Sequence, residues 1–150
     1  MSAEISAYVF ICENAIEDKT SVLSAFRIVD VFYVPPQADL PEVGPKIGVS
    51  LHILGSIKVL DTDSDEHAIE LRVRRLNSDK DTPIGEPVKR KFSSDRVPEA
   101  PPSINIHAIL AFVPKQAGVH RVVLLLDGTE VANTLFTIAE RPADSDVFRP

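Results

Sequence analysis

The sequence predicts an all-β protein, a two-sheet antiparallel β-sandwich of about eight strands. Apolar residues recur with a period of two in nearly every segment, which is the spacing of one face of a β-strand. The chain has 12 prolines against 6 glycines, and the prolines interrupt the long stretches that a helical bundle would need. Asp127-Gly128 separates two apolar runs, and this dipeptide favours the type I′ turn of a hairpin.

The length of the chain fits a single domain. Its 150 residues are 44% hydrophobic and 25% charged, which is ordinary for a protein with one hydrophobic core. We expect the sandwich to occupy residues 1–139. The remaining residues, 140–150, combine two prolines with mixed charge and are expected to form a partly ordered tail.

The first half of the chain predicts three strands. Residues 5–12 are apolar on both alternating faces and predict a buried strand. Residues 21–34 predict a long strand with a bulge or bend near Asp30, because a carboxylate on an apolar face is unfavourable unless it turns outward. Residues 35–45 contain four prolines and are predicted to form a connection that crosses between the sheets. In residues 46–57 apolar and polar residues alternate again, which predicts a half-buried strand.

The second half predicts further strands and the hairpin. Residues 69–74 are the best amphipathic strand, with Ile69, Leu71 and Val73 facing inward. Residues 86–92 predict a short charged strand, and 103–113 predict an apolar one. The hairpin covers 117–138 and is expected to form the centre of the core.

Charge and cysteine content exclude several classes of function. With a net charge of −6 and a pI near 5.2, the protein has no overall positive potential that would attract nucleic acid. Nucleic acid is therefore not expected as a partner. No apolar run approaches the ~20 residues that span a bilayer, so no membrane partner is predicted. The single cysteine, Cys12, forms no internal disulfide, and the N-terminus lacks the features of a signal peptide. Both observations predict a cytoplasmic protein.

Two segments carry a resemblance to known proteins. The strand-turn-strand over 7–35 and the final GVHRVVLLLDGTEVANTLFTI, with Gly118, His120, Asp127 and Gly128, resemble a family of small bacterial all-β proteins of unknown function. The same ending is similar to many immunoglobulin-like sandwiches. The resemblance implies a bacterial, cytoplasmic, non-enzymatic sandwich and supplies no catalytic residue.

An acidic loop is the one place where oxygen ligands cluster along the sequence. Asp61, Asp63 and Asp65 are weak candidates for a Ca²⁺ site, and a divalent-cation-dependent ligand-binding domain is the alternative function that we weigh. The spacing does not fit an EF-hand, because Glu66 and Arg72 stand where glycine and glutamate are required. A second loop would have to contribute, with Asp79 and Asp81 or Asp144 and Asp146. The solvated polar loop is the preferred interpretation.

Basic residues gather on two segments that could pair. Arg72, Arg74, Lys89 and Lys91, with Arg75 and Arg90, would form a basic ribbon able to hold an acidic partner. Aromatic residues for stacking bases are missing beside it, apart from Phe92. Protection of a sheet edge and pairing with Glu70 and Glu86 explain the basic ribbon better.

No arrangement of residues in the sequence predicts catalysis. The four histidines, at 52, 67, 107 and 120, occur singly, without the close spacing of a metal site. His52 is interpreted as a solvated or cross-strand residue. Cys12 lies in an apolar strand, where a thiol is not activated, and Asp30 is expected to be structural. We therefore expect no enzyme activity and no cofactor.

The function that remains is a protein-interaction or assembly module with an unknown partner. Residues 108–113 and 122–126 are apolar on both alternating faces, so one face of each strand needs a cover. We predict a homodimer through an outer apolar patch. Its members are predicted to be Ile109, Val113, Val119, Val123 and Leu125, with Ala111 between them.

Overall fold

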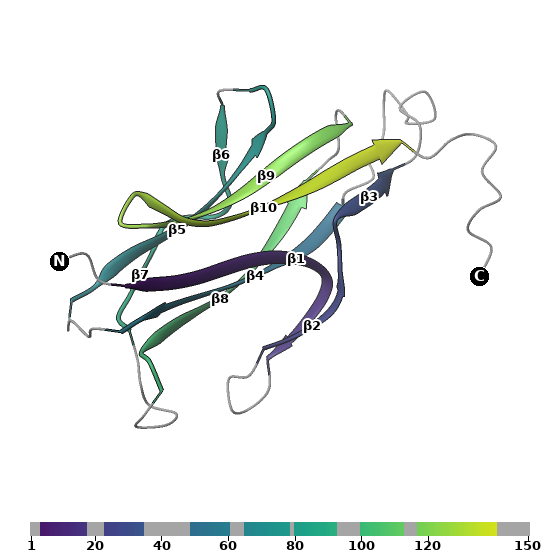
Figure 1. The fold of residues 1–150 in the computed structure, drawn as a ribbon. Coiled ribbons are helices and arrows are strands. Elements are labelled where there is room, and N and C mark those ends of the chain that lie inside the picture. The colour runs from purple at the N-terminus through teal and green to yellow at the C-terminus, as the bar shows by residue number, and fades with distance from the viewer. Residues whose placement is uncertain are drawn as a thin grey trace.

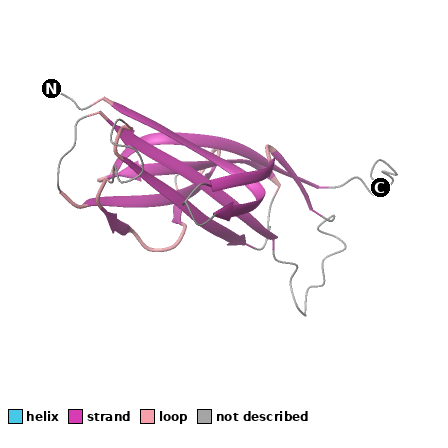
Figure 2. Cartoon of the chain, turned by 90° about the horizontal axis from the view of Figure 1, so that it is seen from below, coloured by secondary structure: helices cyan, strands magenta, loops and turns pink. Residues whose placement is uncertain are grey.

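The residues that the structure describes form ten strands in two stacked sheets. The computed structural model describes residues 4–17, 23–34, 49–60, 65–78, 80–92, 100–112 and 117–140, and these residues contain strands and turns without a helix (Figure 2). The all-β, two-sheet sandwich is therefore confirmed, with more strands than predicted. Within these ranges there is accordingly no helix of the length and apolarity that crossing a membrane requires.

The first layer is a four-stranded antiparallel sheet. It contains β1 (Ile5–Glu17), β2 (Leu23–Ile28), β4 (Val49–Val59) and β8 (Ser103–Phe112). Their order is β2-β1-β4-β8, so β2 and β8 are the two edge strands (Figure 1). The long β1 and β4 pair over eight positions at the centre of the sheet, from Ile5 opposite Val59 to Cys12 opposite His52.

The second layer is a six-stranded mixed sheet. Its path is β3-β10-β9-β5-β6, formed by β3 (Val31–Val34), β10 (Thr129–Glu140), β9 (Gly118–Leu126), β5 (His67–Arg75) and β6 (Asp81–Pro83). The short β7 (Val88–Arg90) pairs with β5 beside β6. The pair of β10 with β3 is parallel, whereas the prediction had only antiparallel pairs.

The core lies between the inner faces of the two sheets. The four-stranded sheet contributes Leu51 and Ile53, and the six-stranded sheet contributes Leu124 and Phe136, each at most 1% exposed. Gly55 lets the layers approach closely, because a Cβ there would lie 3.2 Å from the Tyr8 carbonyl oxygen and 3.4 Å from Leu124 Cδ2. The inward positions predicted for 69, 71, 73, 108, 110, 122, 124 and 126 are confirmed.

A bend at Asp30 carries the chain from one sheet to the other. The predicted 21–34 strand is divided at Val29 and Asp30, so that β2 joins the four-stranded sheet and β3 joins the six-stranded sheet. Arg27 has a positive φ of 55° just before the bend. Asp30 is exposed, as predicted, and its carbonyl accepts a hydrogen bond of 2.8 Å from the Thr137 N–H. The predicted connection over 35–45 lies outside the described residues, and the strands before and after it, β3 and β4, belong to different sheets.

The β9–β10 turn has the predicted geometry. Asp127 and Gly128 have φ values of 49° and 81°, the two positive angles of a type I′ turn, and Leu126 is paired with Thr129. The hairpin extends to Glu140, one residue beyond the predicted boundary of the sandwich. The proposed tail beyond Glu140 lies outside the described residues.

The predicted apolar patch is wrong, because its two strands belong to different sheets. Ile109 lies on the edge strand β8 of one layer, whereas Val119, Val123 and Leu125 lie on β9 of the other. Alternation had shown which residues share a face of one strand, but not which sheet each strand joins. Val113 lies outside the described residues.

Two of the patch residues are also buried. Val123 and Leu125 are only 7% and 8% exposed, although they face away from the core. Cross-strand neighbours cover this outer face: Arg72 and Asn133 stand opposite Val123, and Glu70 and Glu130 stand opposite Leu125. Hydrogen bonds of 2.8 Å join Arg72 to Glu70 and Asn133 to Glu130. Long polar side chains thus cover apolar ones with their aliphatic parts.

Candidate functional site

The edge strand β8 is the least protected element among the described residues. Its ten residues, SINIHAILAF, contain no charged residue and no proline. In the described part of the chain β8 pairs with β4 alone, so its other side offers backbone N–H and C=O groups. An edge of this length and composition is a template for another strand.

The other edges are short or carry features that prevent pairing, and β3, the edge beside β10, has only four residues. The edge of β5 is covered by β6 and β7, which are three residues each and include Pro83, Lys89 and Arg90. The far edge of the four-stranded sheet, β2, contains Arg27 at a positive φ, with its guanidinium 3.3 Å from Glu13. Charge, proline and irregular backbone are the usual means of blocking an edge, and β8 has none of them.

A pair of histidines lies on the outer face of the four-stranded sheet, beside this edge. His52 Nδ1 and His107 Nε2 are 2.8 Å apart, with the rings stacked at 5.1 Å between centroids. The strands β4 and β8 bring together residues that are 55 positions apart, which sequence spacing could not detect. The cross-strand interpretation of His52 is confirmed. Two imidazoles are only part of a metal site, and no group of three ligands occurs among the described residues.

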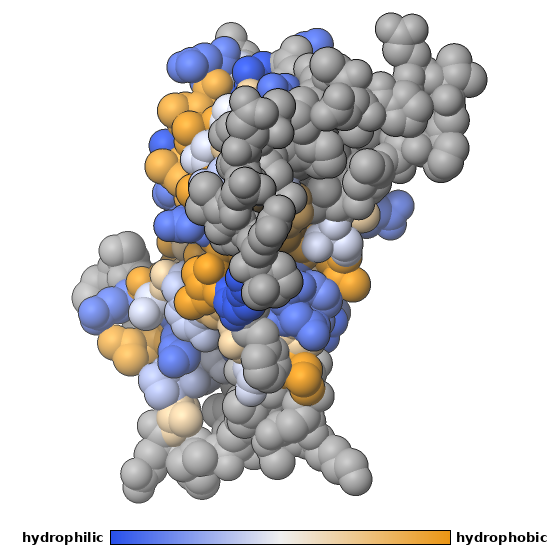
Figure 3. Space-filling view, turned by 90° about the vertical axis from the view of Figure 1, so that its right-hand side faces the viewer, coloured by the Kyte–Doolittle hydropathy of each residue, from blue (hydrophilic) through white to orange (hydrophobic). Residues whose placement is uncertain are grey.

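Exposed apolar side chains surround the histidine pair. The register places Ile28, Cys12, His52 and Ile109 in one row across the sheet, and Ile28 and Ile109 are 69% and 57% exposed. Tyr8, 50% exposed, stacks on Phe10 at 5.7 Å in the neighbouring rows. These rows contain no charged residue. Figure 3 shows apolar side chains at several places on one side of the molecule, among polar ones.

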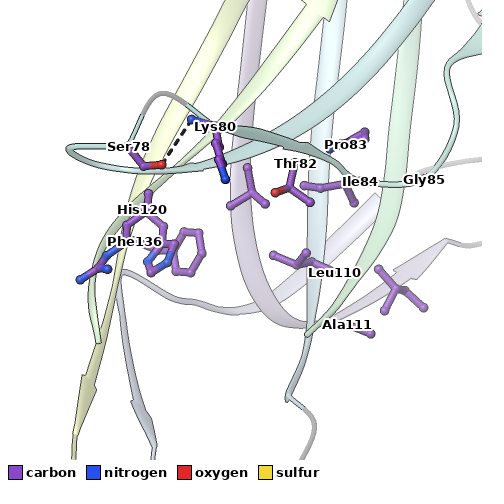
Figure 4. A pocket seen from close by; sticks show the side chains of 13 residues that line it. Ser78, Lys80, Thr82, Pro83, Ile84, Gly85, Leu110, Ala111, His120 and Phe136 are labelled. Carbon is purple, nitrogen blue, oxygen red and sulfur yellow. Dashed lines mark hydrogen bonds between the residues drawn. The ribbon is translucent and has the colours of Figure 1, made fainter. Parts of the chain in front are cut away.

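Two pockets lie along the inner side of β8, between it and the strands β5 to β7. The larger, of about 520 Å³, lies at the C-terminal half of β8, and the smaller, of about 130 Å³, lies at its N-terminal half. Ile84, between β6 and β7, lines both. In the larger pocket His120 and Phe136 form one wall, while Leu110 and Ala111 of β8 form another (Figure 4).

Two residues of the basic ribbon, Arg72 and Arg74, have acidic partners. Strands β5 and β7 pair as the sequence suggested, and Arg72, Arg74 and Lys89 share an outer face. Arg72 pairs with Glu70, as predicted, and Arg74 makes a two-pronged contact with Asp81 in place of the expected Glu86. The Arg74 hydrogen bond is the main reason that the pKa of Asp81 is lowered. Lys91 is exposed just after β7.

The predicted acidic loop lies only partly within the described residues. Asp61 and Asp63 lie outside the described residues, while Asp65 is described and exposed. Asp81, which we had considered as a ligand from a second loop, instead binds Arg74. The described residues therefore supply no second set of carboxylates for a cation at this loop.

Two further candidate side chains, Cys12 and His120, have roles in packing and hydrogen bonding within the fold. Cys12 is fully buried, opposite His52 in the register, where a thiol is not accessible to a substrate. His120 Nδ1–H donates to the Gly118 carbonyl at 3.1 Å, which leaves Nε2 as an acceptor. Burial lowers the pKa of His120, with a smaller contribution from Arg75 and a partly opposing one from the Gly118 carbonyl. The neutral ring stacks on Phe136 at 5.1 Å.

Comparison with known proteins shows no family. No family model and no curated protein matches the chain. A β-glucosidase from Listeria innocua matches 91% of this chain and 16% of its own, at 11% identity and a TM-score of 0.48. The alkylpurine DNA glycosylase AlkC of Pseudomonas fluorescens matches 93% of this chain and 31% of its own, at 10% identity and a TM-score of 0.43. This chain thus spans less than a third of either enzyme, and likenesses at such TM-scores support no inference about function.

Proposed function

We propose that this chain is a non-catalytic assembly module that forms a homodimer by pairing β8 with β8 of a second copy. The observation that carries the proposal is the ten-residue edge strand without charge or proline. Two such strands, arranged antiparallel about a two-fold axis, join two four-stranded sheets into one continuous sheet. The backbone groups of both edges then gain hydrogen-bond partners.

The distribution of charge allows a second copy to approach at β8. The chain carries a net charge of −6, so two copies repel each other at most orientations. Strand β8 and the rows of Tyr8, His52 and Ile109 contain no charged residue, and contact there avoids placing like charges side by side. The exposed Ile109 gains burial from a neighbouring strand.

The proposed setting is a bacterial cytoplasm. Support comes from the only cysteine of the chain, Cys12, which is buried in β1 and forms no disulfide. Such a protein has no need of an oxidising compartment. The absence of activity is likewise part of the proposal, and it is supported by the inaccessible thiol and by the structural roles of the described carboxylates at 81 and 127.

A charge placed on the edge tests the proposal. The unaltered protein is expected to be a dimer by light scattering at tens of micromolar. Ile109→Lys, on β8, is expected to be a folded monomer whose melting temperature does not depend on protein concentration, because a lysine on an edge opposes pairing. Ile28→Lys is the matched control, since Ile28 is equally apolar and exposed on the same face but lies on the other edge strand.

The outcomes separate the edge from the face. A dimer that dissociates only with Ile109→Lys supports pairing through β8. Dissociation by both variants would assign the contact to the outer face of the sheet, and a monomeric unaltered protein would remove the proposal.

A further inference from the structure

The facing nitrogens of His52 and His107 lie almost as close as two ligands of one metal ion. Nδ1 of His52 and Nε2 of His107 are 2.8 Å apart. With metal–nitrogen bonds of about 2.0–2.1 Å, two imidazole nitrogens on a tetrahedral ion lie roughly 3.3 Å apart. His107 is exposed and His52 is half-buried, so a small rotation of the outer ring opens the pair to an ion.

The hydrogen bond between the two rings is compatible with a metal ion in its place. A neutral imidazole carries one proton, on either of its two nitrogens, and one of the facing nitrogens donates its proton to the other. When the donor ring moves that proton to its far nitrogen, both facing nitrogens offer a lone pair. The ion then occupies the position of the shared proton.

The surroundings of the pair select the kind of metal. The rows of the sheet that contain His52 and His107 hold no charged residue among the described strands, and Cys12, in the row of His52, is fully buried. The accessible ligands in these rows are therefore imidazole nitrogens. Imidazole suits Zn²⁺, Ni²⁺ and Cu²⁺, whereas Ca²⁺ and Mg²⁺ take oxygen ligands.

One chain supplies only half of a closed metal site. A structural zinc ion has four ligands, and no group of three metal-ligating side chains occurs in the part of the chain that the structure describes. The missing ligands have to come from a second molecule. His107 lies on the edge strand β8, where the proposed dimer places its second copy.

Pairing of β8 with its copy brings the two His107 side chains together. His107 faces outward, because its neighbours Ile106 and Ala108 pack against the core. Opposite residues of an antiparallel pair share a face, so the two registers of largest overlap place His107 opposite either the partner's His107 or the partner's Ile109. The Cβ atoms of the two His107 side chains are then about 5 Å apart, or roughly 7–8 Å apart on the diagonal. Both separations allow imidazoles from the two copies to reach one ion.

We propose that the two His52–His107 pairs of the dimer together bind one divalent transition-metal ion, with Zn²⁺ as its representative. This inference rests on the proposed function, because the second pair of imidazoles belongs to the second copy. The ion links the side chains of the two edges, in addition to the hydrogen bonds between their backbones. Its positive charge lies between two chains of net charge −6 and thereby favours their association.

Titration calorimetry with Zn²⁺ and light scattering of the metal-stripped protein test the inference. We expect one Zn²⁺ per two chains, and at least a roughly tenfold lower concentration for half-dimerisation when Zn²⁺ is present. Excess Ca²⁺ is expected not to displace Zn²⁺. A metal-free dimer that takes up no Zn²⁺ overturns this inference and leaves the proposed function standing. A dimer that binds one ion per chain overturns the shared site, and a protein that stays monomeric with Zn²⁺ overturns both proposals.

Three variants locate the ion. His52→Asn and His107→Asn each remove one ligand from each copy, and they are expected to weaken Zn²⁺ binding roughly a hundredfold while the metal-free dimer remains. His120→Phe is the control, because it removes a histidine on β9 of the other sheet. Melting temperatures verify that each variant folds. Equal weakening by His120→Phe would show that Zn²⁺ binds unspecifically and would overturn the assignment.

Discussion

His67 at the start of β5 and Asp127 in the β9–β10 turn are hydrogen-bonded, with 2.6 Å between His67 Nδ1 and Asp127 Oδ2. Two further bonds of 2.8 Å join Asp127 to Ala68, one from the Ala68 N–H to Oδ1 and one from the Asp127 N–H to the Ala68 carbonyl. The residue that gives the turn its positive φ therefore also fastens the turn to the neighbouring strand. The His67 hydrogen bond is the largest cause of the lowered pKa of Asp127, and the Ala68 N–H adds to it.

Asp127→Asn is expected to lower stability by about 1 kcal/mol at neutral pH, because a charged hydrogen-bond acceptor becomes a neutral one. The pKa of Asp127 is lower in the folded protein than in the unfolded chain. Its contribution is therefore complete above the unfolded pKa of about 4 and is lost as the pH falls through the folded pKa. Urea unfolding at pH 7 and pH 3 should show a difference between the two proteins that shrinks at pH 3. A difference that stays constant would mean that the carboxylate charge is unimportant.

Gly128→Val should destabilise the protein by more than ~1 kcal/mol, because a β-branched residue resists a positive φ. Gly128 has φ 81°, and a Cβ built there meets no atom within 4 Å, so backbone strain is the sole cause expected. Gly128→Asn is the matched control, since asparagine tolerates this conformation. Denaturation midpoints measure both effects, and equal loss in the two variants would assign the effect to the added side chain.

Stability should fall on acidification below about pH 6.5 through His120. Burial lowers the pKa of this imidazole in the folded protein, so the unfolded chain takes up a proton first. The penalty is absent above the unfolded pKa and grows as the pH falls toward the folded pKa. His120→Phe retains a ring against Phe136 and should lose this part of the pH dependence. Thermal unfolding between pH 7.5 and 5 is the measurement, and parallel curves for the two proteins would contradict the prediction.

Local patterns in the sequence predicted the strands and their inward faces well. The period of two assigned Leu51, Ile53, Leu124 and Leu126 to the core, and the Asp-Gly dipeptide assigned the turn. These features depend on residues within one strand or hairpin, where sequence distance and spatial distance agree.

Features that join distant strands were missed. The His52–His107 pair joins positions 55 apart, and the His67–Asp127 bond joins positions 60 apart. Alternation also left open which sheet β8 belongs to, which is why Ile109 was grouped with residues of β9. Nothing in the sequence indicated the larger pocket beside β8 either, because its walls come from β5, β6, β8, β9 and β10. These contacts, the sheet to which β8 belongs and the pocket all depend on the order of the strands. The alternation of residues within one strand does not predict that order.

The burial of Val123 reverses the expected effect of a charge on β9. Sequence alternation placed Val123 in an exposed apolar patch between two copies, where a glutamate would separate the copies without unfolding them. Val123 is 7% exposed between Arg72 and Asn133, and Arg72 is already paired with Glu70 at 2.8 Å and lies 3.8 Å from Asp81. A glutamate there would lose the burial of the valine and compete for an engaged partner. We expect a loss of about 2–3 kcal/mol in unfolding free energy.

Leu135→Glu provides the matched control for this prediction. Leu135 lies on the same outer face of the six-stranded sheet, opposite Arg121 in the register, and is 47% exposed. A glutamate there remains in water beside a cation, so its effect on stability should stay within about 0.5 kcal/mol. Urea unfolding of the two variants compares one substitution at two depths on one face. Equal stability of both would mean that the polar side chains above Val123 leave it accessible, and the outer face of β9 would again be a candidate contact between copies.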